Sequence, residues 1–288
     1  MSRLIPYLTA ATGMAFVGGS VAISGSLADA PQFTVQALRY AVACLLLYGY
    51  ARSRRIPVLR PRGRDWFWLT GIAATGMVLF NLALVEGAGH AEPAVLGVAV
   101  ACVPPLLAVA GPALEGRPVS RTVLLAAAVV TAGAALVQGF GRADATGLAW
   151  AVVTFACEAA FTLLAVPVLT RHGAVGVSLH TTWLAALILT ALSLTVEGPG
   201  AVSRLTGNDL LAGAYLAVMV TAVAFVLWYS SVRSLGAGQT GLLTGVAPVA
   251  AALAGTALGD PLPRLLVWAG IATVTAGLAL GISRPRAI

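Results

Sequence analysis

The chain has 288 residues, of which 59% are hydrophobic and only 9% are charged. This small number of polar groups could not cover the surface of a water-soluble fold. The composition therefore excludes a soluble globular protein and predicts one embedded in lipid. The formal net charge of +7 would suggest nucleic-acid binding in a soluble protein, but here we assign it to the membrane surface and expect no nucleic-acid partner.

Apolar runs separated by short loops fill almost the whole chain. Each is close to the roughly 20 residues that a helix needs to cross the hydrocarbon layer. We predict spans at approximately 4–25, 33–51, 66–87, 92–113, 121–140, 146–169, 177–196, 209–232, 236–258 and 263–283. The predicted fold is therefore an all-α integral membrane protein with ten transmembrane helices and no soluble catalytic domain.

The first run, from Leu4 to about Ile23, is followed by Ala28-Asp29-Ala30, which looks like a signal-peptidase site. A cleaved signal peptide is therefore an alternative to a first span. The apolar core of a signal peptide has about 7–15 residues, and this run is longer. We favour a retained helix.

Arginine residues are distributed unevenly between the two sides that ten spans define. The loop between the second and third spans carries six of them: Arg52, Arg54, Arg55, Arg60, Arg62 and Arg64. Counted over the chain, thirteen arginines fall on the side of this loop, whereas Arg142, Arg204 and Arg264 fall on the other. By the positive-inside rule, this asymmetry predicts an even number of spans with both termini in the cytoplasm.

The second and third spans contain polar residues. Arg39 lies about 9 Å below the outer end of its span, where it either snorkels to the interface or pairs with an acidic residue. Glu86, near the outer end of the third span, is the candidate partner. We interpret it as an interfacial or pairing residue rather than a proton carrier, and Asn81 adds a polar group to the same span.

Prolines interrupt the fourth and ninth spans near their middles. Pro104 and Pro105, and Pro248 in the ninth span, each remove one backbone donor and free the carbonyl four residues earlier. We take Pro105 and Pro248 as candidate hinges, with a static packing kink as the alternative. Thr244 shares the Pro248 face and is a candidate for the substrate path.

Glu158 lies near the middle of the sixth span, where an acidic side chain costs about 2.5–3.5 kcal/mol on insertion scales. Thr154 and Thr162 are one turn away on either side, so the three residues form a polar stripe that we expect to face the bundle interior. The functional interpretation is a proton-titrating or cation-binding site. The alternative is a hydrogen-bonded packing residue.

A shift of 143 or 144 residues aligns the two halves of the chain. Pro105 then falls on Pro248, residues 116–118 on 259–261, and residues 130–133 on 274–277. This predicts two five-helix repeats, 1–143 and 144–288, inserted with opposite orientation because five is odd. The shift also places His180 on Gln36 and Trp183 on Arg39. Such positions are candidates for a shared cavity, although His180 could instead be solvated at the inner surface.

With these features the sequence resembles the drug/metabolite transporter superfamily, specifically its ten-helix EamA-like type. Ala37-Leu38-Arg39, the proline-centred fourth and ninth helices, and the turns at 115–120 and 258–262 carry the resemblance. The family's usual glutamate in those turns is replaced by Arg117 and by Asp260. The resemblance implies a secondary transporter, and specifically an exporter of small metabolites such as amino acids or drugs, in the bacterial plasma membrane.

Other function classes are less well supported. No Walker-type phosphate loop and no His-Glu-x-x-His helix is present, so we expect neither a primary pump nor a zinc enzyme, and no cofactor or metal. The three cysteines, Cys44, Cys102 and Cys157, lie inside apolar runs as packing residues. The expected partners are a small-molecule substrate and the lipid bilayer. A homodimer through spaced glycines, such as Gly277 and Gly281, and a non-transporting scaffold stay open.

Overall fold

The computed structural model describes residues 4–24, 27, 29–259 and 261–282. Statements on structure refer to these residues, so Ala28 of the alternative cleavage site and Arg3, Asp260, Arg284 and Arg286 lie outside them. Within the described part of the chain every regular element is a helix, and the only β pairing is one isolated bridge between Ala91 and Ala143.

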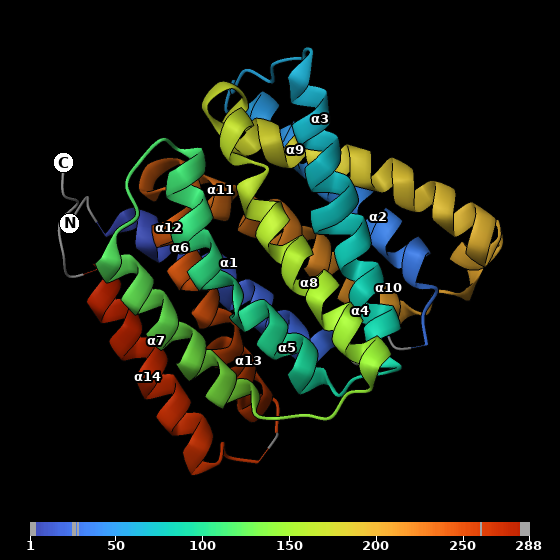
Figure 1. The fold of residues 1–288 in the computed structure, drawn as a ribbon. Helices are drawn as coiled ribbons and strands as arrows, with labels where there is room; N and C mark the ends of the chain where they lie inside the picture. Colours follow the sequence, from blue (N-terminus) through green and yellow to red (C-terminus); the bar gives the residue numbers. More distant parts are fainter. Residues whose placement is uncertain (1–3, 25–26, 28, 260, 283–288) are drawn as a thin grey trace.

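Ten long helical segments run through the described residues, and several change helix type without a loop. Figure 1 shows how the helices are arranged in space. The first half contains α1 Ile5–Ser24, α2 Gln32–Ser53, α3 Arg64–Gly71 continued by η2 Ile72–Leu79 and α4 Phe80–Ala88, α5 Pro93–Ala101 with α6 Val103–Leu114, and α7 Arg121–Gln138. The second half contains α8 Ala145–Leu163, α9 Val166–Leu192 continued by η3 Ser193–Glu197, the short η4 Ala201–Arg204, α10 Gly207–Tyr215 with η5 Leu216–Val223 and α11 Ala224–Leu235, α12 Ala237–Gly241 with η6 Leu242–Gly245 and α13 Val246–Ala257, and α14 Leu265–Ile282.

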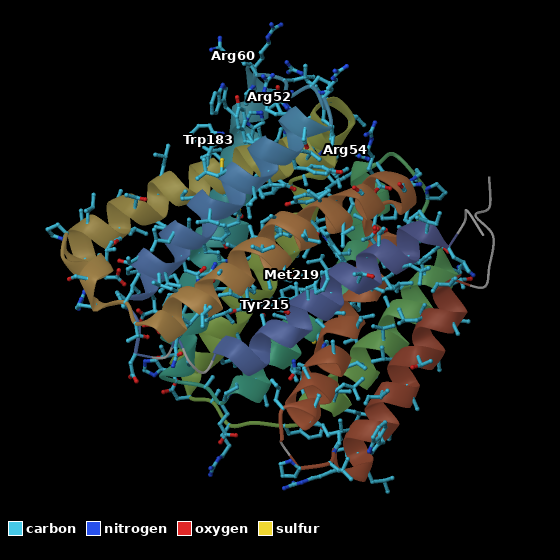
Figure 2. All side chains as sticks on the ribbon, turned by 180° about the vertical axis from the view of Figure 1, so that it is seen from behind. Arg52, Arg54, Arg60, Trp183, Tyr215 and Met219 are labelled. Carbon is cyan, nitrogen blue, oxygen red and sulfur yellow. The ribbon has the colours of Figure 1, made fainter. Side chains whose placement is uncertain are left out.

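Eight of these segments, all between residues 64 and 282, are long and apolar enough to cross a membrane by their length and composition, as judged over the described residues. The other two are α1 and α2, and Gln36 and Arg39 interrupt the apolar run of α2. The chain is therefore a multi-pass, all-helical membrane protein. Figure 2 shows Arg52, Arg54 and Arg60 gathered at one end of the bundle.

The sixth expected span is interrupted, and the seventh begins close to its predicted position. α8 ends at Leu163, but Leu164 and Ala165 keep helical dihedral angles, and the chain is regularly helical again from Val166. Pro167 explains the interruption, because it lacks the N–H that would bond to the Leu163 carbonyl. The range of α9 holds two helices that meet at Gly173, whose φ of 66° is a conformation that glycine adopts readily, so the seventh span starts just after Gly173, near the predicted 177.

Irregular helix geometry recurs at the spacing of the sequence repeat. The π-helical segments η2, 72–79, and η5, 216–223, each have eight residues and lie 144 residues apart. The break between α5 and α6 at Cys102 lies 143 residues before Gly245, where the 3-10 segment η6 ends. π-Helical turns are rare and often occur at functional sites. These four irregular places therefore direct attention to the third, fourth, eighth and ninth helical segments.

Glycines allow α7 and α14 to pack side by side (Figure 1). A Cβ atom on Gly133 would lie 2.6 Å from the backbone nitrogen of Val274, and one on Gly277 would lie 2.9 Å from that of Val130. A Cβ on Gly281 would meet Leu242 of the same chain. These contacts lie inside one chain, so the glycine spacing is explained by internal packing and is no evidence for a homodimer.

Candidate functional site

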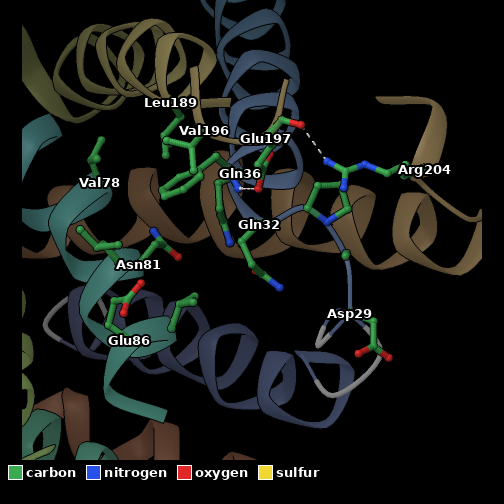
Figure 3. Close-up of a pocket in the computed structure, with 15 residues that line it drawn as sticks. Asp29, Gln32, Gln36, Val78, Asn81, Glu86, Leu189, Val196, Glu197 and Arg204 are labelled. Atoms are coloured by element: carbon green, nitrogen blue, oxygen red, sulfur yellow. Dashed lines mark hydrogen bonds between the residues drawn. The ribbon is translucent and has the colours of Figure 1, made fainter. Parts of the chain in front are cut away.

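A cavity of about 420 Å³ lies at the end of the bundle where α2 begins and α4 ends (Figure 3). Its wall combines helices of both halves of the chain. α2 and α4 come from the first half, and α9, η3 and η4 come from the second. The polar residues that line it are Asp29, Gln32, Gln36, Asn81, Glu86, Glu197 and Arg204. Three of the residues singled out from the sequence, Gln36, Asn81 and Glu86, therefore share this cavity.

The N-terminus of α2 is held by a carboxylate from the other half of the chain. Glu197 accepts hydrogen bonds from the backbone N–H of Phe33 and of Thr34, both at 2.8 Å, and from the Thr34 hydroxyl at 2.6 Å. Since the first N–H groups of a helix have no partner within the helix, a carboxylate there supplies both hydrogen bonds and a favourable charge. Glu197 thus joins η3 to α2 at the cavity wall. The Arg204 guanidinium donates to the Glu197 backbone carbonyl at 2.9 Å.

Arg39 does not pair with Glu86, contrary to the sequence-based candidate. Its Nε donates to the Thr221 hydroxyl at 2.8 Å, its Nη1 donates to the Gln36 side-chain oxygen at 3.0 Å, and its guanidinium lies 5.0 Å from the centre of the Tyr40 ring. Thr221 belongs to the π-helical segment η5. Arg39 therefore connects α2 of the first half to the irregular helix of the second half, and the cavity keeps Glu86 as an acid without a partner among the described residues.

Asn81 fixes the deep wall of the cavity. Its amide nitrogen donates to the Tyr40 hydroxyl at 3.0 Å and also to the Met77 carbonyl. Tyr40 is only 2% exposed, so the hydrogen bond satisfies a buried hydroxyl. With both donors engaged, the Asn81 side-chain oxygen is left as an acceptor at the cavity.

Glu158 lies on the interior face of α8 and does not line this cavity. It is half-buried and has no hydrogen bond or ion pair among the residues that the structure describes. The hydroxyls of Thr154 and Thr162 are fully buried but satisfied elsewhere: Thr154 donates to the Trp150 carbonyl at 2.8 Å, and Thr162 accepts from the Trp228 indole at 3.0 Å. The stripe faces the interior as expected, but its three members are not bonded to one another.

Two aromatic residues connect the surroundings of Glu158 to the cavity. Trp228 and Tyr229 are 2% and 0% exposed, so they are core residues and not part of an interfacial belt. Tyr229 stacks on Phe161 with 5.0 Å between ring centres, donates its hydroxyl to the Phe161 carbonyl of α8 at 3.1 Å, and belongs to the same buried core cluster as Tyr40. Because Tyr40 is hydrogen-bonded to Asn81, buried polar groups extend from the cavity wall towards Glu158.

His180 and Trp183 lie away from the cavity, at the end of the bundle that holds the arginine-rich loop. The Trp183 indole donates to His180 Nδ1 at 3.2 Å, so His180 Nε2 carries the proton that it donates to the Leu59 carbonyl at 2.8 Å. Nε2 thus anchors the loop of residues 54–63, and Nδ1 is occupied by Trp183 of the same helix. The structure does not bring this pair together with Gln36 and Arg39.

The candidate hinges coincide with irregular helix geometry. The Ala101 carbonyl, which Pro105 leaves without its usual donor, accepts the Thr131 hydroxyl of α7 at 3.0 Å. Pro248 follows the 3-10 segment η6, in which the buried Thr244 hydroxyl donates to the Gly241 carbonyl at 2.8 Å. A neighbouring hydroxyl therefore satisfies the Ala101 carbonyl that Pro105 leaves free. The Thr244 hydroxyl bonds to its own helix.

Two acidic residues at opposite ends of the bundle were not anticipated from the sequence. Besides Glu197, Glu115 at the end of α6 accepts the backbone N–H of Ala237 at 2.7 Å and pairs with Arg117. It lines a smaller cavity of about 230 Å³ at the opposite end. Each half thus places a carboxylate on the N-terminus of a helix of the other half. Both residues stand at the ends of apolar runs, and no local pattern indicates their partners more than 100 residues away.

Comparisons with known proteins give a consistent result. A sequence model described as the EamA-like transporter family matches the chain twice, at residues 4–138 and 145–283. An uncharacterized transporter, YetK of Bacillus subtilis, is 26% identical over 291 residues, covering 97% of this chain and 87% of the relative. A protein of Streptantibioticus cattleyicolor named "Probable terminal-alkyne amino-acid exporter" is 28% identical over 219 residues, covering 74% and 72%. A solved crystal structure superimposes with a TM-score of 0.80 over 96% of both chains at 20% identity, a likeness of fold alone.

Proposed function

The chain belongs to the EamA-like transporter family, and from this premise we propose that it is a secondary transporter that exports small metabolites, such as amino acids or drugs, across the bacterial plasma membrane. In this proposal all ten long helical segments span the membrane as two inverted five-helix repeats, 1–143 and 144–288, with both termini in the cytoplasm. Transport then proceeds by alternating access to a site between the repeats.

The observation that carries the proposal is the cavity between α2, α4 and α9. It combines residues of both repeats, and a site at a repeat interface is where inverted-repeat transporters bind their substrates. With cytoplasmic termini, the arginine-rich loop is internal and the cavity opens to the outside. At the other end of the bundle, Glu115 accepts the backbone N–H of Ala237 at the start of α12 and pairs with Arg117. The molecule thus corresponds to an outward-facing conformation.

Proton coupling is assigned to Glu158. A carboxylate without a partner inside a membrane domain is costly, and such residues commonly mark ion or proton pathways. Glu158 is half-buried. Tyr229, which packs on Phe161 of the same helix, and Tyr40, which is hydrogen-bonded to Asn81, connect its surroundings to the cavity. Protonation of Glu158 from one side and its release on the other would couple the movement of substrate to a proton gradient.

The test is transport of a panel of labelled amino acids and cationic drugs in inside-out vesicles, with and without a proton gradient. We expect uptake that depends on the gradient and that Glu158→Gln abolishes, while Thr154→Val, on the same face of α8, retains it. Uptake that is independent of the gradient and survives Glu158→Gln would make the protein a facilitator with Glu158 in a packing role. No transport of any compound would favour a scaffold.

A further inference from the structure

The charges that line the cavity indicate the charge of the compound that it binds. The inference drawn from them rests on the proposed function. We propose that the cavity selects compounds with a primary ammonium group, which Glu86 and the side-chain oxygen of Asn81 hold, while the rest of the compound packs against the apolar wall. The site thus takes amines with a short apolar tail in preference to neutral or anionic compounds of the same shape.

The charges that line the cavity are unequally available. Glu197 is committed to the N-terminus of α2 through both of its oxygens. Arg204 is exposed and hydrogen-bonded to the Glu197 carbonyl, and Arg39 does not belong to the lining. Among the described lining residues, Asp29 and Glu86 are acids without a hydrogen bond or ion pair. The described lining carries three carboxylates, Asp29, Glu86 and Glu197, against one guanidinium, Arg204. Its net charge is therefore negative, which favours a cationic ligand and opposes an anionic one.

A second observation, independent of the acids, comes from the buried amides. Gln36 is only 8% exposed and its side-chain oxygen accepts from Arg39, so its amide nitrogen has no partner among the described residues and is directed into the cavity. The Asn81 oxygen is free for the complementary reason, since its nitrogen donates to Tyr40 and Met77. The α4 wall thus offers acceptors, and the facing α2 wall offers a donor (Figure 3).

An ammonium group suits the α4 wall because it has three donors and no acceptor. Glu86 and Asn81 lie five residues apart on the same helix and provide a charged and a neutral acceptor. The Gln36 amide nitrogen would meet an acceptor elsewhere on the compound. The apolar part of the wall includes Val78, Leu82, Val85, Leu189 and Val196, and is suited to an aromatic or branched aliphatic tail.

Equilibrium binding to the purified full-length protein in nanodiscs tests the inference without any transport step. The probes are 2-phenylethylamine, which is cationic at neutral pH, and 2-phenylethanol, which has nearly the same shape and no charge. Empty nanodiscs correct for partition into lipid. The variants are Glu86→Gln, which keeps the shape and removes the charge, and Asp29→Asn as a matched control, since it removes the other unpaired acid of the lining.

We expect the wild-type protein and Asp29→Asn to bind the amine about ten- to hundredfold more tightly than the alcohol, the range of a hydrogen bond to a charged group. Glu86→Gln should lose most of this preference while keeping its affinity for the alcohol. Equal affinity of the wild type for both probes, absence of amine binding at millimolar concentration, or an unchanged preference in Glu86→Gln would overturn the proposal. The thermal unfolding midpoint of each variant establishes that it is folded.

The outcome separates this inference from the proposed function. If the amine preference depends on Glu86 but vesicles transport nothing, the site stands and the transport function fails. If vesicles transport substrate but Glu86→Gln leaves the amine preference unchanged, the transport function stands and the ammonium site fails.

Discussion

Replacing Glu197 by glutamine tests the link between the two halves at the cavity. The carboxylate accepts three hydrogen bonds from Phe33 and Thr34, at distances of 2.6 to 2.8 Å. A glutamine side chain keeps one acceptor oxygen, but it turns its NH₂ donors towards a backbone N–H that is itself a donor. One helix N–H is then left without a partner, and the favourable charge at the helix N-terminus is lost.

The size of the effect follows from this loss. A hydrogen bond to a charged group contributes about 1.5–3 kcal/mol. One of the three is removed, and the other two then reach a neutral oxygen instead of a charged one. Glu197 is only half-buried, so water replaces part of the loss, and we expect the free energy of unfolding to fall by about 2 kcal/mol. For a chain of this size the thermal midpoint should drop by roughly 4–8 °C.

Two measurements on the purified protein check this prediction. Intrinsic tryptophan fluorescence gives the thermal midpoint, and hydrogen exchange reports the backbone amides of Phe33 and Thr34, which should exchange faster in Glu197→Gln. Glu86→Gln is the matched control, because Glu86 lines the same cavity without a hydrogen bond among the described residues. Unchanged protection of the two amides, or an equal loss of stability in the control, would refute the reasoning.

Two further predictions concern the ends and the packing of the bundle. The pKa of Asp144 is lowered first by a backbone N–H in the first turn of α8 and then by His90. Its contribution to the loop is therefore present at neutral pH and lost as the pH falls below the ordinary aspartate value of about 3.9. Hydrogen exchange of the Gly147 amide, which donates to the Asp144 carboxylate at 2.8 Å, should then rise relative to its intrinsic rate in the wild type, and Asp144→Asn should remove this change. Gly133→Ala should lower the thermal midpoint, because its Cβ would lie 2.6 Å from the Val274 nitrogen. Gly49→Ala, in open space on α2, should not, and equal midpoints for the two variants would contradict the proposed close packing.

Much of the helix arrangement follows from the sequence because apolar length and proline position act locally. Pro105 and Pro248 indicated two irregular helices, and the structure has breaks or 3-10 turns beside both. The interruption of the sixth span after Leu163 was missed because Ala165 and Val166 continue the apolar run. The π-helical segments leave no mark in composition.

The site was only partly accessible to sequence reasoning. Asn81 and Glu86 stood out as polar residues in an apolar run and Gln36 through the repeat alignment with His180, and the structure places all three in the cavity. Their partners did not stand out, because both the lipid-facing and the interior faces of a membrane helix are apolar, so that the rotation of each helix is poorly determined by its sequence. Arg39 therefore reaches Thr221 in the other half instead of Glu86.

The most direct test of transport through the cavity is site-directed alkylation of Val85→Cys, in a chain whose three native cysteines are replaced by alanine. Val85 is 46% exposed and lines the cavity. A membrane-impermeant maleimide should modify it from the outside of intact cells, substrate should slow the modification, and complete modification should stop transport in vesicles made from those cells. Modification only from the inside, or full transport after complete modification, would contradict an outward-open cavity on the substrate path.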